Sequence, residues 1–225
     1  MYDTTPGEHR RGTPPKQSTR HVPRGEGRRC ARLLMTPLTS NSDQPEPRFV
    51  WLDLEMTGLN PDVDAILEIA VVVTGTDLNP LGEMTRVIGY SEETLEQMSD
   101  IVRRMHSSNG LIKDVIESKT TLREAERVAL QLVVQHCEPG EAILCGNSIH
   151  YDWLFLVRHM PRLEHYLHSR QIDVSTTKML VEAWAPGLRY DGLRSNHRAL
   201  EDVHASIREL RYYRDAIFSR ASGSP

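Results

Sequence analysis

Five residues that could bind metal ions and move a proton are spread along this chain. Asp53 and Glu55 stand in FVWLDLEMTGL, Asp152 follows LCGNSIHY, and His197 and Asp202 stand in NHRALEDV. Carboxylate oxygens are the ligands that Mg²⁺ and Mn²⁺ prefer, and a neutral imidazole can take a proton from water. The combination is that of a metal-dependent nuclease, and the sequence has no Cys/His cluster of zinc spacing.

Strand and helix geometry decides whether these side chains can meet. Residues i and i+2 of a strand face the same side, so Asp53 and Glu55 should project together while Leu54 points the other way. Two like charges this close repel each other unless a cation lies between them. His197 and Asp202 would lie about 140° apart if both were helical. They can therefore share a site only if His197 stands in the loop before the helix and reaches back.

Each of these signals also has an ordinary structural explanation. A D-x-E pair can be the solvated end of a strand, and an acidic residue such as Asp152 often begins a helix for capping and dipole reasons. The functional alternative for Asp152 is a metal ligand at the carboxyl end of the strand AILCG. A histidine in a loop is ordinarily a surface residue. The signals favour chemistry because they occur together.

Composition divides the 225 residues into two parts. Residues 1–48 hold seven of the thirteen prolines and show no hydrophobic period, so we expect a disordered Arg/Pro-rich extension. An organelle-targeting peptide and a true translation start at Met35 are open alternatives for this segment. We expect one domain over residues 49–219 and a short disordered tail over residues 220–225.

The two parts also differ in charge. Residues 1–49 carry nine Lys and Arg against five Asp and Glu, whereas the remainder carries 18 against 26. Long duplex nucleic acid is gripped by a dense basic surface, so an acidic domain favours a short substrate held by metal ions. No apolar stretch approaches the roughly 20 residues of a membrane span, and we expect a cytoplasmic protein without membrane contact. Three cysteines without metal-ligand spacing are expected to be free thiols: Cys30, Cys137 and Cys145.

The apolar pattern predicts an α/β domain with a mixed sheet. Three strands are expected first, as an antiparallel meander, and helices alternate with strands afterwards. The expected strands cover residues 49–56, 65–75, 84–90, 142–146 and 171–174. The expected helices cover residues 92–106, 122–133, 151–159, 163–169 and 176–184, and a last helix follows the polar loop 185–196.

Four segments in this order resemble the DEDDh family of 3′→5′ exonucleases, and within it the oligoribonucleases: WLDLEMTGL, LCGNSI, DVST and NHRALEDV. The resemblance covers residues 49–218. It implies a ribonuclease H-like mixed β-sheet flanked by helices. The family's metal-binding carboxylates fall on Asp53, Glu55, Asp152 and Asp202, and its general base falls on His197.

The resemblance also implies a mechanism and a substrate. Two divalent cations, Mg²⁺ or Mn²⁺, are expected, one between Asp53, Glu55 and Asp202 and the second mainly at Asp53. His197 is expected to deprotonate the attacking water, and a 5′-mononucleotide leaves. The implied substrate is short single-stranded RNA of two to five nucleotides, dinucleotides in particular. The implied assembly is a homodimer in which each site is completed by the partner.

Substrate-binding residues carry over from the same resemblance. Leu59, after the Thr-Gly turn, matches the family's wedge against a base, and His106 matches its histidine near the substrate. The cap on the 5′ phosphate of a dinucleotide falls on Ser148, Arg170 and Ser175. A guanidinium suits that bidentate task.

Two aromatic residues of the family are replaced in this chain. Ile101 stands where many relatives carry a stacking Trp, and Ser169 stands where a Tyr from the partner often precedes the capping arginine. Stacking on a base contributes about 1–3 kcal/mol. Their loss would weaken the grip on a dinucleotide or relax the length selectivity, unless Tyr166 or His168 compensates.

Two other functions stay open from the sequence. One is a proofreading or repair exonuclease on single-stranded DNA, against which the acidic domain and the phosphate-capping set count. The other is a catalytically idle nucleic-acid-binding protein that kept the fold. The idle protein would be favoured by the loss of any one of the five residues named first, and none is lost.

Overall fold

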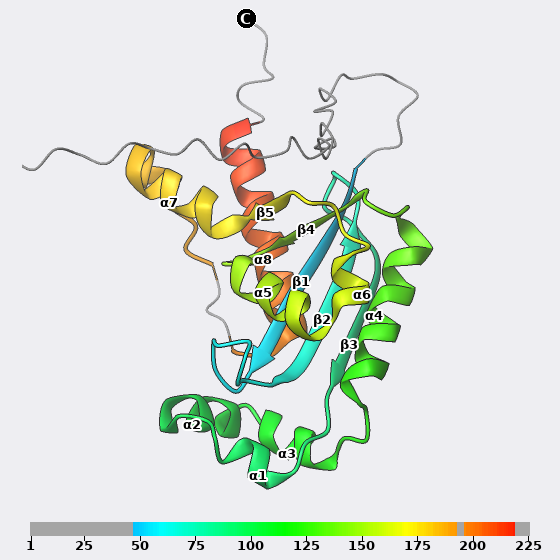
Figure 1. Cartoon of the computed structure of the whole chain (residues 1–225). Helices are drawn as coiled ribbons and strands as arrows, with labels where there is room; N and C mark the ends of the chain where they lie inside the picture. The colour runs from blue at the N-terminus through cyan, green and yellow to red at the C-terminus, as the bar shows by residue number, and fades with distance from the viewer. Residues whose placement is uncertain (1–46, 193–195, 219–225) are drawn as a thin grey trace, which may run out of the picture. The chain divides into compact units, whose positions relative to one another are not determined.

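A computed structural model describes residues 47–192 and 196–218 of the chain (Figure 1). The expected disordered tail, nearly all of the expected extension and Cys30 lie outside the described residues. Arg48, which composition assigned to the extension, instead begins the first strand. Within the described ranges, no helix is both long enough and apolar enough to cross a membrane.

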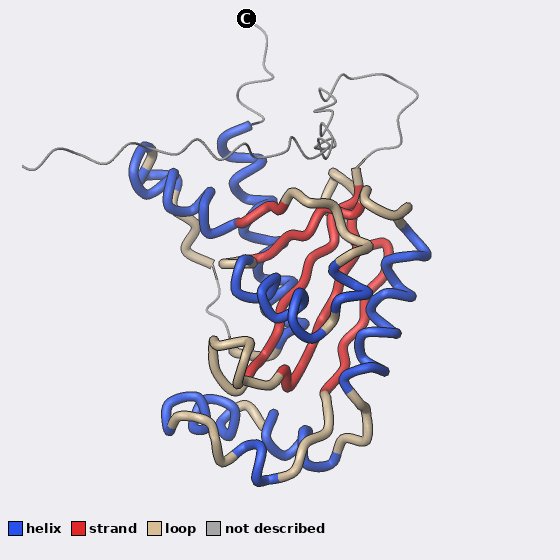
Figure 2. Tube along the Cα trace, in the orientation of Figure 1, coloured by secondary structure: helices blue, strands red, loops and turns tan. Residues whose placement is uncertain are grey.

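Among the described residues, five strands form one sheet in the order β3-β2-β1-β4-β5 (Figure 2). The first three form the expected antiparallel meander, whereas β4 and β5 run parallel to β1. The mixed sheet predicted from the sequence is therefore confirmed, and the carboxyl ends of β1, β4 and β5 lie at one edge. The strands are β1 (Arg48–Met56), β2 (Ile66–Thr74), β3 (Pro80–Val87), β4 (Ala142–Gly146) and β5 (Gln171–Asp173).

Helices cover both faces of the sheet (Figure 1). Val50, Leu52 and Leu54 of β1 join a buried cluster with α4, α5 and α6 on one face. Trp51 joins a second cluster with α7 and α8 on the opposite face. These helices are α4 (Leu122–His136), α5 (His150–His159), α6 (Pro161–Glu164), α7 (Val174–Trp184) and α8 (Ala199–Tyr213). A turn of 3₁₀ helix (Pro186–Leu188) follows α7, and a π-helical turn (Arg214–Phe218) follows α8.

Three short helices between β3 and α4 form a separate layer: α1 (Glu92–Leu95), α2 (Asp100–Ser108) and α3 (Leu111–Glu117). They pack on Leu67 of β2 through a small apolar cluster. The single helix predicted over residues 92–106 is wrong, because Ser99 accepts the N–H of Val102 and starts a new helix there. Gly110, with φ of 80°, then turns the chain into α3, which the apolar pattern did not predict.

Other boundaries differ from the predictions by a few residues. The third strand begins at Pro80, a position that an edge strand tolerates. The helix predicted over residues 163–169 is instead α6, because Pro161 supplies a favourable first residue. α8 begins at Ala199, so His197 stands in the preceding loop as predicted. Cys137 and Cys145 are free and buried, which confirms that prediction.

Candidate active site

Asp53 and Glu55 lie near the carboxyl end of β1 and belong to the same face of the sheet as Trp51. Leu52 and Leu54 are buried in the core on the opposite face. This alternation follows from the two-residue period of a strand. Glu55 is 6% exposed, so its carboxylate is almost withdrawn from solvent. The common face predicted for the two carboxylates is therefore present.

Asp202 and His197 meet Glu55 at this face. Asp202 lies in the first turn of α8, where its N–H bonds to the carbonyl of Arg198 at 3.1 Å. His197 stands two residues before that helix with a left-handed backbone, φ 57°. One ligand atom each of Glu55, His197 and Asp202 lies within 4.8 Å of the other two. The loop thus brings His197 close to Asp202, although a regular helix would have placed the two side chains on different sides.

Asp152 approaches from a different element. It lies in the first turn of α5, after β4, and is 6% exposed. Its Oδ1 accepts the backbone N–H of Leu54 at 2.9 Å, which ties the helix to β1. Burial raises the pKa of Asp152 from 3.8 to about 7, although the hydrogen bond from Leu54 opposes that rise. Asp152 lies outside the close group of Glu55, His197 and Asp202.

The carboxylates perturb one another strongly. Burial and then the charges of Asp152, Glu55 and Asp202 raise the pKa of Asp53 well above its usual value. Burial and then the charges of Asp202 and Glu68 raise the pKa of Glu55 from 4.5 to about 8. Such repulsion is relieved when a cation lies among the carboxylates. The donor set therefore fits divalent cations, and His197 is near enough for its imidazole to be weighed as a further ligand.

A cavity of about 770 Å³ opens over these residues. Asp53, Glu55, His197 and Asp202 line it together with two cationic side chains, Lys178 and Arg189. Lys178 lies on α7, one turn after Ser175, and is half-buried. The combination suits a substrate that carries phosphates, because basic side chains form strong hydrogen bonds to phosphate oxygens.

A chain of hydrogen bonds runs through three residues that line the cavity, Asn147, Ser175 and Ser206. The Oγ atoms of Ser148 and Ser175 lie 3.1 Å apart, and the Ser175 hydroxyl donates to Oδ1 of Asn147 at 3.2 Å. The Nδ2 of Asn147 donates to the Ser206 hydroxyl at 2.9 Å, and that hydroxyl donates to the carbonyl of Asp202 at 3.0 Å. Asn147 thus links the two serines to α8. Asn147 was not predicted from the sequence, although it stands in the segment LCGNSI.

Leu59 and His106 have contrasting surroundings. Leu59 is 61% exposed in the turn after β1, beyond the carboxylates. His106 on α2 is fully buried, with Nε2 3.1 Å from the carbonyl of Met56 and Nδ1 3.9 Å from Oε2 of Glu55. Burial lowers the pKa of His106. Nδ1 has no hydrogen-bond partner within the described part of the chain. His106 thus lies against a candidate metal ligand.

The remaining substrate-binding predictions concern the surface. Arg170 is exposed and lies just before β5, whereas Ser175 follows the other end of that strand. Ile101 is 73% exposed on α2. Ser169 is also exposed, and the hydroxyl of nearby Tyr166 is occupied by a 2.7 Å bond to the carbonyl of Cys137. One chain thus brings Ser148 and Ser175 together but places Arg170 elsewhere.

Sequence comparisons connect the chain to named proteins. Residues 50–210 match the Exonuclease family model, RNase_T. An oligoribonuclease of Streptomyces coelicolor is 47% identical over 175 residues, which are 76% of this chain and 87% of that protein. An oligoribonuclease of Marinobacter nauticus is 43% identical over 182 residues, 80% of this chain and 98% of that protein. The one from Corynebacterium glutamicum is 45% identical over 192 residues, 84% of this chain and 86% of that protein.

Structure comparisons identify the same fold at low identity. The Mg²⁺- and Mn²⁺-bound form of Pop2p from S. pombe has a TM-score of 0.61 and 14% identity, over 80% of this chain and 87% of that one. Exonuclease I of Methylocaldum szegediense has a TM-score of 0.58 and 18% identity; the match spans 76% of this chain but 41% of that one. The zinc-bound complex of E. coli ExoI with single-stranded DNA also has a TM-score of 0.58, over 77% of this chain and 41% of that one.

Proposed function

We propose, on the premise that this chain belongs to the oligoribonuclease family of exonucleases, that its cavity holds the 3′ end of a very short RNA for hydrolysis. The chain is a 3′→5′ exoribonuclease, a phosphodiester hydrolase that releases 5′-mononucleotides from short RNA. One observation carries the assignment of the site. Glu55, His197 and Asp202, from a strand, a loop and a helix, meet in the cavity that Asp53 also lines.

The four carboxylates would hold two divalent cations, Mg²⁺ or Mn²⁺. The support is electrostatic, because the charges of Asp152, Glu55 and Asp202 all raise the pKa of Asp53. Oxygen ligands favour these hard ions over zinc. Bound cations would lower the pKa of water and stabilise the charge that develops on the phosphate and the leaving 3′ oxygen. Asp152 would complete the set through its fixed position against Leu54.

His197 would act as the general base. Its side chain is exposed at the cavity, and one of its ring nitrogens lies within 4.8 Å of ligand atoms of Glu55 and Asp202. A neutral imidazole there would accept the proton of the attacking water and pass it to solvent. Proton transfer of this kind typically accelerates a reaction by about 10²–10⁴-fold. The carboxylates would hold the metal ions while His197 moves the proton.

The 5′ phosphate of the RNA would bind beside the two serines. The hydroxyls of Ser148 and Ser175 are adjacent, and Lys178 presents a positive charge one helical turn further along α7. The amino-terminal end of that helix adds a favourable dipole for an anion. Hydrogen bonds to a charged group contribute about 1.5–3 kcal/mol each. A terminal phosphate held here would favour fragments that just span the cavity.

A second copy of the chain would supply the capping arginine. Arg170 lies at the opposite end of β5 from Ser175, so it is poorly placed to cap a phosphate in its own chain. Large apolar side chains are exposed on α5 and α7, as at the interfaces of homodimers. They are Tyr151, Leu154, Val157, Met179, Leu180 and Trp184, of which Trp184 is 78% exposed. We place the dimer interface on these two helices.

Mixing two impaired variants tests this arrangement. Arg170→Ala and Ser148→Ala dimers should each cleave 5′-phosphorylated dinucleotide slowly. After subunit exchange, one site of each mixed dimer would regain both groups if Arg170 acts across the interface, so activity should recover. No recovery, with exchange verified by two differently tagged chains, would place Arg170 outside the partner's site. Trp184→Glu should shift wild-type protein towards monomer in sedimentation.

The activity itself is tested with 5′-labelled RNAs of two, three, five, seven and twenty nucleotides, with Mg²⁺ or Mn²⁺ and a matched DNA series. We expect the fastest release of product from the dinucleotide, a fall with length, and none from Asp202→Ala. Arg127→Gln, on the exposed surface of α4, is the matched control. Equal rates at all lengths or a preference for DNA would overturn the assignment to very short RNA.

A further inference from the structure

The backbone of His197 is held in an unusual conformation by its neighbours. Its φ of 57° lies in the left-handed region, which residues other than glycine rarely occupy. Such a residue persists only where the surrounding structure fixes it. His197 lies in a loop, because α8 begins two residues later at Ala199. The contacts that fix this loop therefore decide where the imidazole points.

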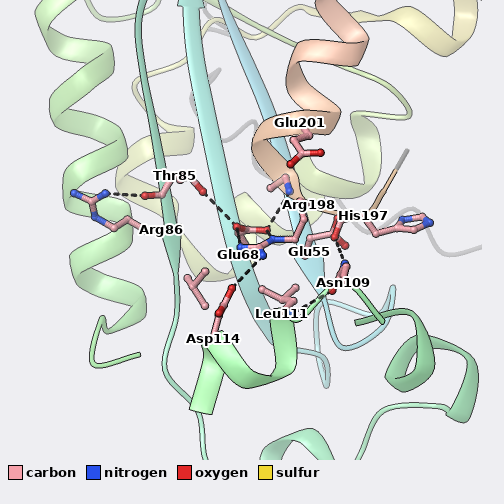
Figure 3. Close-up of polar contacts among 12 residues, drawn as sticks. Glu55, Glu68, Thr85, Arg86, Asn109, Leu111, Asp114, His197, Arg198 and Glu201 are labelled. Carbon is pink, nitrogen blue, oxygen red and sulfur yellow. Dashed lines mark hydrogen bonds and ion pairs between the residues drawn. The ribbon is translucent and has the colours of Figure 1, made fainter. Parts of the chain in front are cut away.

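The first contact is an ion pair between Arg198 and Glu68 of β2 (Figure 3). The guanidinium donates from Nε at 3.2 Å and from Nη2 at 3.0 Å, one bond to each carboxylate oxygen. The Glu68 side chain is 3% exposed, and Oε2 also accepts the N–H of Ala199 at 3.1 Å. Glu68 thus holds both the residue after His197 and the first turn of α8.

The second set of contacts comes from the layer of short helices. Asp114 of α3 pairs with Nη1 of Arg198 at 3.0 Å, so the guanidinium bridges β2 and α3. Asn109, which ends α2, donates from Nδ2 to the carbonyl of His197 and to that of Asn196 at 3.3 Å. These contacts hold the backbone on both sides of the imidazole.

Glu68 also stands directly opposite Glu55 across the β1–β2 pair. Its carboxylate adds a fifth negative charge beside the four carboxylates of the site. The guanidinium of Arg198 engages both of its oxygens. Arg198 therefore holds the carboxylate of Glu68 against the loop that contains His197.

We propose that Arg198, Glu68 and Asn109 are positioning residues that act through His197. Arg198 and Glu68 fix the position of the loop against β2, and Asn109 fixes the peptide group of His197 itself. This inference rests on the proposed role of His197 as general base. A displacement of about 1 Å at a reacting group can reduce a rate by about 10²-fold. Loosening the loop should therefore slow the chemical step and leave substrate and metal binding intact.

Arg198→Lys and Asn109→Ala test the proposal, each alone and combined with His197→Ala. Lysine keeps the positive charge beside buried Glu68, so the fold should survive. Its ammonium group cannot form the two-bond pairing that the guanidinium makes with the carboxylate. Asn109 is half-buried at a helix end, where alanine should be tolerated. The control is Arg127→Gln, which breaks a pair of the same geometry that is exposed on α4, with bonds of 2.9 and 2.6 Å to Glu124.

We expect Arg198→Lys to lower kcat by about 10–100-fold and Asn109→Ala by a smaller factor. KM for short RNA and the number of Mn²⁺ ions bound should stay unchanged. In the His197→Ala background neither substitution should lower kcat further, because both act through that imidazole. The proposal would be overturned if either substitution lowered kcat further in the His197→Ala background. It would also be overturned if either substitution reduced the number of bound Mn²⁺ ions.

A second readout separates failure of the proposal from failure of the proposed function. The carbon Cε1 signal of labelled His197 reports the order of the imidazole whether or not RNA is cleaved. We expect one sharp signal in wild type and in Arg127→Gln, and a broadened or shifted signal in Arg198→Lys. An unchanged signal would overturn the positioning role even if the wild type cleaves RNA. Ordered His197 in a wild type that cleaves no RNA would refute the proposed function alone.

Discussion

The carboxylates and the histidine of this site are held in different ways. Asp53 and Glu55 stand on a paired strand, and Asp152 and Asp202 stand in the first turns of two helices packed on the sheet. His197 stands in a loop whose position depends on side-chain contacts from β2, α2 and α3. The proposed metal ligands are thus placed by backbone hydrogen bonds, whereas the proposed base is placed by a few side chains. The two groups should respond differently to substitution.

Loss of a ligand should have the largest effect. Asp53→Ala removes a carboxyl group whose pKa is raised by the charges of four other carboxylates. We expect kcat to fall by about 10⁴-fold or more, since metal ions supply several kcal/mol of stabilisation to such reactions. Mn²⁺ binding should be lost, while the metal-free protein should melt at a higher temperature at pH 8, because folding no longer has to bury or protonate that carboxyl group. Calorimetric titration and thermal melts measure both; retained Mn²⁺ binding would refute the role of Asp53.

Loss of the base should be smaller and should leave the metal ions in place. His197→Ala is expected to lower kcat by about 10²–10⁴-fold with little change in KM. The exposed loop should tolerate alanine, although relief of the left-handed backbone requires glycine instead. His197→Gly is therefore the companion variant, with the same kinetic loss. Single-turnover hydrolysis of a dinucleotide gives the rate. A decrease in this rate of less than tenfold would mean that another group takes the proton.

The stability of the metal-free protein should decrease as the pH rises. A carboxyl whose pKa is higher in the folded chain than in the unfolded chain binds more protons when folded, so raising the pH favours unfolding. The window is pH 4.5 to about 8 for Glu55 and pH 3.8 to about 7 for Asp152. The expected slope is about 1.4 kcal/mol per pH unit for each carboxyl.

Denaturant melts across this range, with chelator and then with Mn²⁺, measure that slope. Added Mn²⁺ should stabilise the protein most at the high end of the range, because the cation can replace the protons that Asp152 and Glu55 lose there. The variant Glu55→Gln should flatten the profile of the chelated protein. A metal-free protein whose stability rises through this window would contradict the proposed mutual repulsion of the carboxylates.

The smallest effect should come from the phosphate-binding end of the cavity. Ser148→Ala removes one hydroxyl near the expected 5′ phosphate, at a cost of about 1.5–3 kcal/mol for a charged acceptor. We expect kcat/KM to fall by about 10–100-fold for a 5′-phosphorylated dinucleotide. A dinucleotide with a 5′ hydroxyl should be cleaved by wild type and variant at similar rates. Equal losses on both substrates would show that Ser148 acts on the fold rather than on the phosphate.

The same contrast explains what could be predicted from the sequence. The shared face of Asp53 and Glu55 follows from the period of a strand, and the loop position of His197 follows from the period of a helix. The mixed sheet was predicted from strands that precede alternating helices. The roles of the five residues followed from the resemblance and are still predictions, as are Leu59, His106 and the phosphate cap.

What could not be predicted depends on contacts between distant segments. Arg198 and Glu68 are 130 residues apart, and neither stands in a pattern that marks an ion pair. The break at Ser99 and the helix α3 were missed because short helices have too few turns to show a period. Asn109 was missed for the same reason, since its role depends on where α2 ends. Boundaries and buried polar networks are therefore the part that the structure adds.

Mn²⁺ binding to His197→Ala is the decisive measurement, because His197 lies as close to Glu55 and Asp202 as a ligand would. Titration calorimetry and electron paramagnetic resonance, at one pH and with wild type and Asp53→Ala alongside, give the number of ions and their affinity. If His197 is the base, the variant should bind two Mn²⁺ ions as tightly as wild type, and its hydrolysis of dinucleotide should fall by about 10²–10⁴-fold. Weaker binding or one ion fewer would make His197 a metal ligand and contradict its role as the base.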